Sequence, residues 1–174
     1  KAIRLFDEIA SVYRGKPQAQ KLFYMYAQSL YKTGEFYSAS YQFESFATQY
    51  PDSEKFEEAS FLGAESYSKL SPRYSLDQEY TYTAIEKLQK FINNYPQSQY
   101  LPQANAALKV LTDKLEKKAY EIALNYQKTA DAFRDYNAAM KMYDNFLIDF
   151  PGSQFKEEIL FNKLQSAYNL ALNS

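Results

Sequence analysis

The chain has 174 residues and contains no Cys, His or Trp, whereas it holds 18 Tyr and 13 Phe. The missing residue types exclude disulfides, zinc sites built from Cys and His, and the common catalytic triads. A formal net charge of −1, from 20 basic and 21 acidic residues, gives no support to nucleic-acid binding. No apolar run is longer than a few residues, which is too short to span a membrane.

The first segment, residues 1–15, carries Ala2, Phe6, Ile9 and Tyr13. These residues stand at offsets of 0, 4, 7 and 11, which trace one face of an α-helix. We interpret the segment as the second helix of a repeat whose first helix precedes residue 1, and we expect the natural protein to continue beyond both ends of the chain.

The same offsets recur in three later copies, each of which ends in an aromatic residue followed by Pro. Proline disfavours the α conformation in the residue before it, so each copy is predicted to be a helix that stops there. The Asp or Ser that follows each Pro is predicted to cap the next helix. The repeat positions, which we expect to be structural, are Ala39, Phe43, Phe46 and Pro51, then Ala84, Leu88, Phe91 and Pro96, then Ala139, Tyr143, Phe146 and Pro151.

A partner helix is predicted before each of these copies, and another follows the last one. The boundaries are a repeat over residues 17–51, a repeat over 54–96 with an insertion at 71–78, a repeat over 100–151 with a first helix of about thirty residues, and a truncated repeat over 154–174. No segment alternates with the period of a strand, so the sequence predicts an all-α protein.

The helix pair resembles the tetratricopeptide repeat. The matching positions in the first complete copy are Phe23, Tyr26, Ala27, Leu30, Ala39, Phe43 and Pro51. Phe46 departs from the family pattern, which has a small residue there. The resemblance implies that residues 1–174 form a single right-handed superhelical solenoid of antiparallel helix pairs with a concave surface.

Longer stretches resemble the BamD (YfiO) family of outer-membrane assembly lipoproteins. They are the Phe43-Glu44-x-Phe46 and Tyr-Pro-x-Ser patterns, the segment 113–123, and the loop 71–78. The resemblance implies a lipoprotein on the periplasmic face of the bacterial outer membrane, attached only through a lipid-bearing Cys upstream of residue 1. It also implies a scaffold in outer-membrane protein assembly that binds the periplasmic domains of BamA, other lipoproteins of that machinery and unfolded outer-membrane proteins.

Candidate partner-binding residues follow from family analogy, which places the concave wall on the first helices. The predicted wall consists of Lys21, Tyr24, Gln28, Tyr31 and Lys32, with Phe61 and Glu65 in the next repeat. Such a groove suits an extended peptide with aromatic side chains and a terminal carboxylate, and the alternative is ordinary solvated surface. In the insertion, Arg73 and Tyr74 are either a contact pair or part of a loop that packs on its own repeat.

Two other binding functions stay open at this point. One is a periplasmic tetratricopeptide adaptor of cell-envelope biogenesis that acts without BamA, and the other is a glycan-binding helical lipoprotein whose exposed Tyr side chains stack on sugar rings. No arrangement of base, nucleophile and orienting residue can be assembled from the spacing, so we expect a protein that is not an enzyme and that uses no metal or cofactor.

Overall fold

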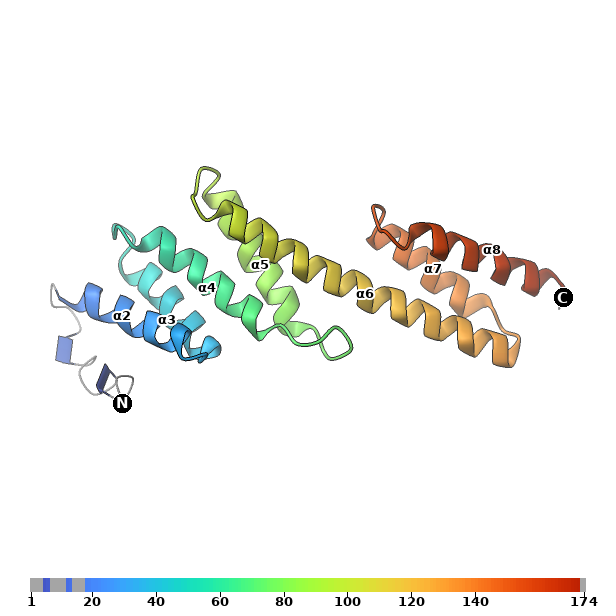
Figure 1. Cartoon of the computed structure of the whole chain (residues 1–174), viewed down its shortest axis with the longest axis horizontal. Helices are drawn as coiled ribbons and strands as arrows, with labels where there is room; N and C mark the ends of the chain where they lie inside the picture. The colour runs from blue at the N-terminus through green and yellow to red at the C-terminus, as the bar shows by residue number, and fades with distance from the viewer. Residues whose placement is uncertain (1–4, 7–11, 14–17, 173–174) are drawn as a thin grey trace. The chain divides into compact units, whose positions relative to one another are not determined.

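The computed structural model describes residues 5–6, 12–13 and 18–172, and every regular element in these ranges is an α-helix (Figure 1). The prediction of an all-α protein is therefore confirmed. The helices are α2 (Ala19–Lys32), α3 (Phe36–Gln49), α4 (Phe56–Leu70), α5 (Glu79–Asn94), α6 (Leu101–Phe133), α7 (Asn137–Asp149) and α8 (Lys156–Leu172).

The predicted helix over residues 1–15 falls mainly on residues outside those ranges. Ala2, Ile9 and Arg14 lie outside the described residues. Phe6 is described, and its ring packs on that of Tyr26 in α2 with the centroids 5.5 Å apart.

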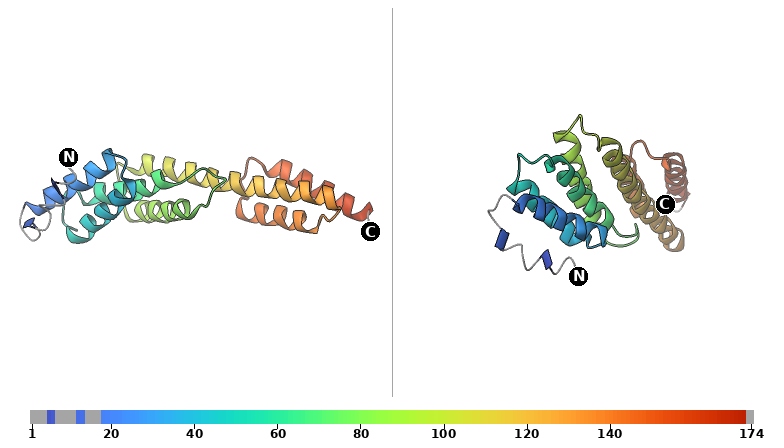
Figure 2. Two further views of the ribbon diagram at one scale, coloured as in Figure 1. Left: turned by 90° about the horizontal axis from the view of Figure 1, so that it is seen from below. Right: turned by 60° about the vertical axis from the view of Figure 1, so that its left-hand side comes forward.

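The chain divides into two compact units, residues 1–112 and 113–174. In the first unit, α2 and α3 form one antiparallel pair and α4 and α5 form the next, as Figures 1 and 2 show. The start of α6 packs on the second pair through Ala104 and Leu111. The single solenoid over all residues and its superhelical path stay predictions.

The second unit contains the rest of α6 together with α7 and α8. Its core is formed by Ala123 and Ala130 of α6, three buried residues of α7, and Ile159 of α8. The predicted long first helix is confirmed, because α6 is a single helix of 33 residues.

The apolar repeat positions form the buried side of the second helices. Ala39, Ala84 and Ala139 are fully buried, and the large residues four and seven positions later are at most 3% exposed. A methyl group at the Ala position lets the neighbouring helix approach closely, so the large side chains beyond it fill the remaining space. Each second helix ends directly before the aromatic–Pro dipeptide, at Gln49, Asn94 and Asp149.

The loops after these helices correct the predicted capping. Ser53 does not occupy the N-cap of α4, which is Lys55 and has no side-chain cap. The turn is longer than predicted, because Ser53 N donates to Tyr50 O at 3.1 Å before the helix starts. Ser53 Oγ instead accepts a hydrogen bond from the backbone N of Lys55 at 3.0 Å. Ser98 and Ser153 accept in the same way from the residue two positions later.

Tyrosine ionisation is expected to destabilise the second unit at high pH. Burial raises the pKa of Tyr143 to about 12. Burial and the Glu158 carboxylate likewise raise the pKa of Tyr120 to about 12. Tyr in an unfolded chain has a pKa near 10, so above that value the unfolded state loses its protons first. Stability from these residues is therefore fully present below pH ~10 and falls as the pH rises toward 12. Urea midpoints from pH 9 to 12 should fall less steeply in Tyr143→Phe than in the wild type, and equal slopes would contradict the prediction.

Candidate functional site

Three of the predicted wall residues line one cavity of about 690 Å³ in the first unit. Lys21, Tyr24 and Gln28 stand on α2 and border it from one side. Phe46 of α3 and the segment 52–55 complete the lining. Since this segment lies in the loop between α3 and α4, the fold brings it beside α2, and the sequence spacing alone does not reveal the cavity.

Tyr24 and Phe61, both predicted on the wall, are largely buried. Their side chains are only 7% and 4% exposed and belong to the two hydrophobic clusters of the first unit. Both helices turn these rings toward the second helix of their own repeat, where Phe46 and Phe91 stand. An aromatic residue at this position is therefore mainly part of the hydrophobic core. It can contact a partner only through the edge or face of its ring that stays exposed.

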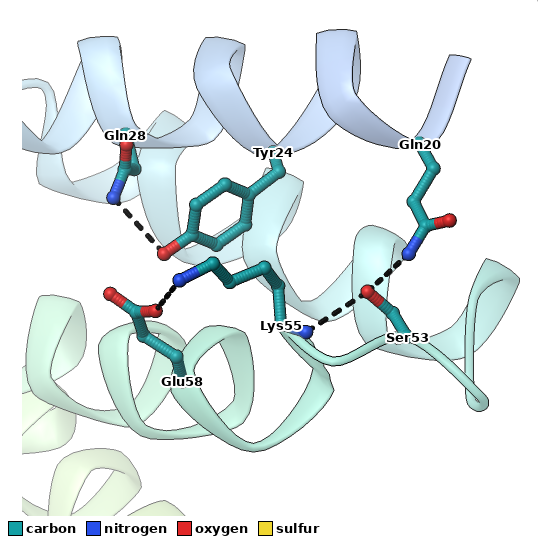
Figure 3. Close-up of polar contacts among 6 residues, drawn as sticks. All are labelled: Gln20, Tyr24, Gln28, Ser53, Lys55 and Glu58. Atoms are coloured by element: carbon teal, nitrogen blue, oxygen red, sulfur yellow. Dashed lines mark hydrogen bonds and ion pairs between the residues drawn. The ribbon is translucent and has the colours of Figure 1, made fainter. Parts of the chain in front are cut away.

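Polar side chains surround the Tyr24 hydroxyl (Figure 3). Gln28 Nε2 donates to Tyr24 Oη at 3.0 Å, and Lys55 Nζ forms an ion pair with Glu58 Oε2 at 2.8 Å. Burial and a hydrogen bond with Glu58 raise the pKa of Tyr24, so its hydroxyl stays protonated. Lys55 Nζ also lies 5.6 Å from the centre of the Tyr24 ring. At the other end of the cavity, Gln20 Nε2 donates to Ser53 Oγ.

Tyr31 and Glu65, which were both predicted on the wall, bind each other. Tyr31 Oη donates to Glu65 Oε2 at 2.8 Å and so joins α2 to α4. Burial and the Glu65 carboxylate raise the pKa of Tyr31. Lys69 Nζ lies 3.7 Å from the other oxygen of Glu65. Lys32, in the last turn of α2, is exposed.

The 71–78 loop is held together by Gln78, which is 3% exposed. Its Nε2 donates to Arg73 O at 2.9 Å and to Leu76 O at 3.0 Å, while its Oε1 accepts from Thr81 Oγ1 at 2.7 Å. The loop therefore packs on its own repeat, and it presents Arg73 with its guanidinium 5.5 Å from the ring centre of Tyr74. Sequence reasoning missed Gln78, because nothing in the repeat pattern distinguishes it.

Each repeat also contains an aromatic layer that the sequence analysis missed. The layer pairs a ring of the first helix with the Phe that departs from the tetratricopeptide pattern. Its members are Tyr24 with Phe46 at 5.4 Å between ring centres, Phe61 with Phe91 at 5.5 Å, and Tyr120 with Phe146 at 6.5 Å. The bulk of Phe46 is therefore explained by the ring that it meets.

The loop serines tie each layer to a side chain of a first helix. Ser98 Oγ donates to Glu57 Oε1 and Ser153 Oγ donates to Glu116 Oε1, and Gln20 contacts Ser53 at the equivalent place. These contacts join residues 33 to 41 positions apart, so the repeated Ser has a tertiary role that its spacing alone did not disclose.

Comparison with known proteins identifies the family. The chain matches the family model YfiO, described as outer membrane lipoprotein, over residues 1–174. The chain belongs to this family. It is also similar to a protein of Aquifex aeolicus (strain VF5) described as a putative outer membrane protein assembly factor BamD. The two are 33% identical over 146 residues, which cover 84% of this chain and 46% of the relative.

Membership in the outer membrane lipoprotein family assigns the protein to the outer membrane. The chain spans about half the length of the curated relative that it matches. Among the described helices, none combines the length and the apolar character that a membrane crossing requires.

Proposed function

We propose that this chain is part of a non-enzymatic scaffold for the assembly of outer-membrane proteins, acting on the periplasmic face of that membrane. The observation that carries the proposal is the family match over all 174 residues. The name of the Aquifex relative supports the same role. The helical repeats fit it as well, because stacked helix pairs present extended surfaces for other polypeptides.

The proposed partners are the periplasmic domains of BamA and unfolded outer-membrane proteins. The 71–78 loop suits a folded partner, since Gln78 fixes its backbone in advance and so lowers the entropy lost on binding. Arg73 is exposed on it, and Arg beside Tyr is a frequent centre of binding energy. The cavity beside α2 suits a single side chain of an extended polypeptide.

A pull-down tests the assignment of BamA. Immobilised protein is expected to retain the periplasmic domains of BamA at micromolar concentration and low salt. Arg73→Ala should weaken this binding about tenfold or more, as the loss of a central Arg contact does. Ser75→Ala is the matched control on the same loop and should bind like the wild type.

Two results would overturn parts of this proposal. Failure of the wild type to retain BamA would favour an adaptor that works without it. Retention that is equal in Arg73→Ala and in the wild type would place the BamA contact elsewhere than on the 71–78 loop.

A further inference from the structure

Three equivalent residues stand directly before a first helix, each two positions after a loop serine: Lys55, Tyr100 and Phe155. Two of them extend the aromatic layer. Tyr100 stacks on Phe61 with the ring centres 5.0 Å apart and the planes 10° from parallel. Phe155 stacks on Tyr120 at 4.1 Å and 16°. In these repeats the ring of the first helix therefore contacts a Phe of the second helix and stacks with a further ring from the next loop.

The first repeat breaks this pattern at Lys55. Tyr24 has Phe46 on one side, as in the other repeats, but it meets the Lys55 amine where a ring would stand. The cavity of about 690 Å³ borders the same place and is lined by Tyr24, Phe46 and Lys55. The backbone around Lys55 is held as in the other loops, because Ser53 Oγ accepts its N–H. The backbone contact is thus shared, and the side chain that meets the first-helix ring differs.

We propose that this place, the Tyr24 slot, binds an aromatic side chain of a partner polypeptide. The guest ring takes the position that Tyr100 and Phe155 fill from within the chain, and it stacks on Tyr24. The inference rests on the comparison of the three repeats, so it stands apart from the identity of the partner proposed above.

The chemistry of the slot fits such a guest. Lys55 is half exposed and paired with Glu58 in a surface ion pair, which contributes little to stability, so its stem can move aside at low cost. An ammonium group and an aromatic ring also attract each other, so the displaced Lys55 amine can pack against the ring of the guest. Lys21 and Gln28 on the rim supply donors for the backbone carbonyls of the guest segment.

A tryptophan probe tests the slot, because the chain contains no Trp and all Trp emission then comes from the probe. The probe is the capped tripeptide acetyl-Gly-Trp-Gly-amide, titrated with the protein under excitation selective for Trp. Its emission should shift to the blue and its anisotropy should rise. The Tyr tripeptide should displace it, and the Leu tripeptide should be at least about tenfold weaker, since it cannot stack on a ring.

Two substitutions of one residue give opposite expectations. Lys55→Tyr supplies a ring from within the chain and should weaken probe binding at least about tenfold. Lys55→Ala leaves the slot open and should keep binding the probe, less only the contribution of the amine. Lys32→Tyr, at an exposed position of α2, controls for an added surface Tyr and should leave binding unchanged.

The reciprocal variant Tyr100→Lys opens an equivalent slot over Phe61 and should raise the stoichiometry from one probe to two. Circular dichroism establishes that each variant is helical, and if Lys55→Tyr does not fold, the stoichiometry of Tyr100→Lys decides the question. The proposal is overturned if the wild type does not bind the probe at millimolar concentration, if folded Lys55→Tyr binds it like the wild type, or if Tyr100→Lys keeps a single site.

Discussion

Phe46→Ala is expected to lower the free energy of unfolding by about 3–5 kcal/mol, the usual range for truncating a buried Phe. Its side chain is 1% exposed. It packs on the rings of Tyr24 and Tyr50, with centre-to-centre distances of 5.4 and 5.3 Å. Removing it leaves a cavity in the aromatic layer, and the surrounding side chains can close it only in part. Urea denaturation followed by circular dichroism measures the change.

Tyr41→Ala is the matched control for this prediction. Tyr41 lies on the same helix, α3, but 66% of its surface is exposed. A surface truncation of this kind is expected to change stability by no more than about 0.5 kcal/mol. Similar losses in the two variants would show that burial of Phe46 in the aromatic layer does not account for the effect.

Gln127→Leu is expected to cost about 1–3 kcal/mol, the penalty for leaving a buried donor without a partner. Gln127 Oε1 accepts hydrogen bonds from Tyr143 Oη at 2.8 Å and from Ser166 Oγ at 2.6 Å, and so joins α6 to α7 and α8. Tyr143 is fully buried, so its hydroxyl finds no water when the acceptor is lost. Ser166 keeps a second acceptor, Asn162 O, at 2.8 Å. Urea denaturation of the two proteins measures the loss.

The double variant Gln127→Leu with Tyr143→Phe separates the hydrogen bond from the packing. Removing both partners leaves no buried polar atom from the pair, so we expect the double variant to be more stable than Gln127→Leu alone. If the two losses simply add, the Tyr143–Gln127 hydrogen bond does not carry the effect.

The helices could be predicted because their signals are local. The spacing of Ala39, Phe43 and Phe46 marks one face of a helix, and Pro51 marks where that helix stops. The length of α6 followed from an uninterrupted helical pattern between two such stops. The capping serines were placed wrongly, because the length of the turn after Pro depends on a hydrogen bond from Ser53 to Tyr50 that composition does not reveal.

The candidate site was predictable only in part. Lys21, Tyr24 and Gln28 do line one cavity, since their spacing of three to four residues puts them along one side of α2. The burial of Tyr24 and Phe61 was not predicted, because the wall was assigned by family analogy and the spacing does not show which neighbour covers a ring. Gln78, Glu65 and Lys55 acquire their roles from partners in other elements.

The amino-acid sequence by itself determined the repeat, its helices and the absence of the residue types that most catalysis needs, because these depend on spacing and composition along one chain. The tertiary structure alone decided which rings are covered. Tyr24, Phe61 and Tyr120 look alike in sequence, and each meets a Phe of its own second helix. They differ in the residue that the following loop brings back over them, and the spacing of that residue in the sequence does not show that it meets the ring.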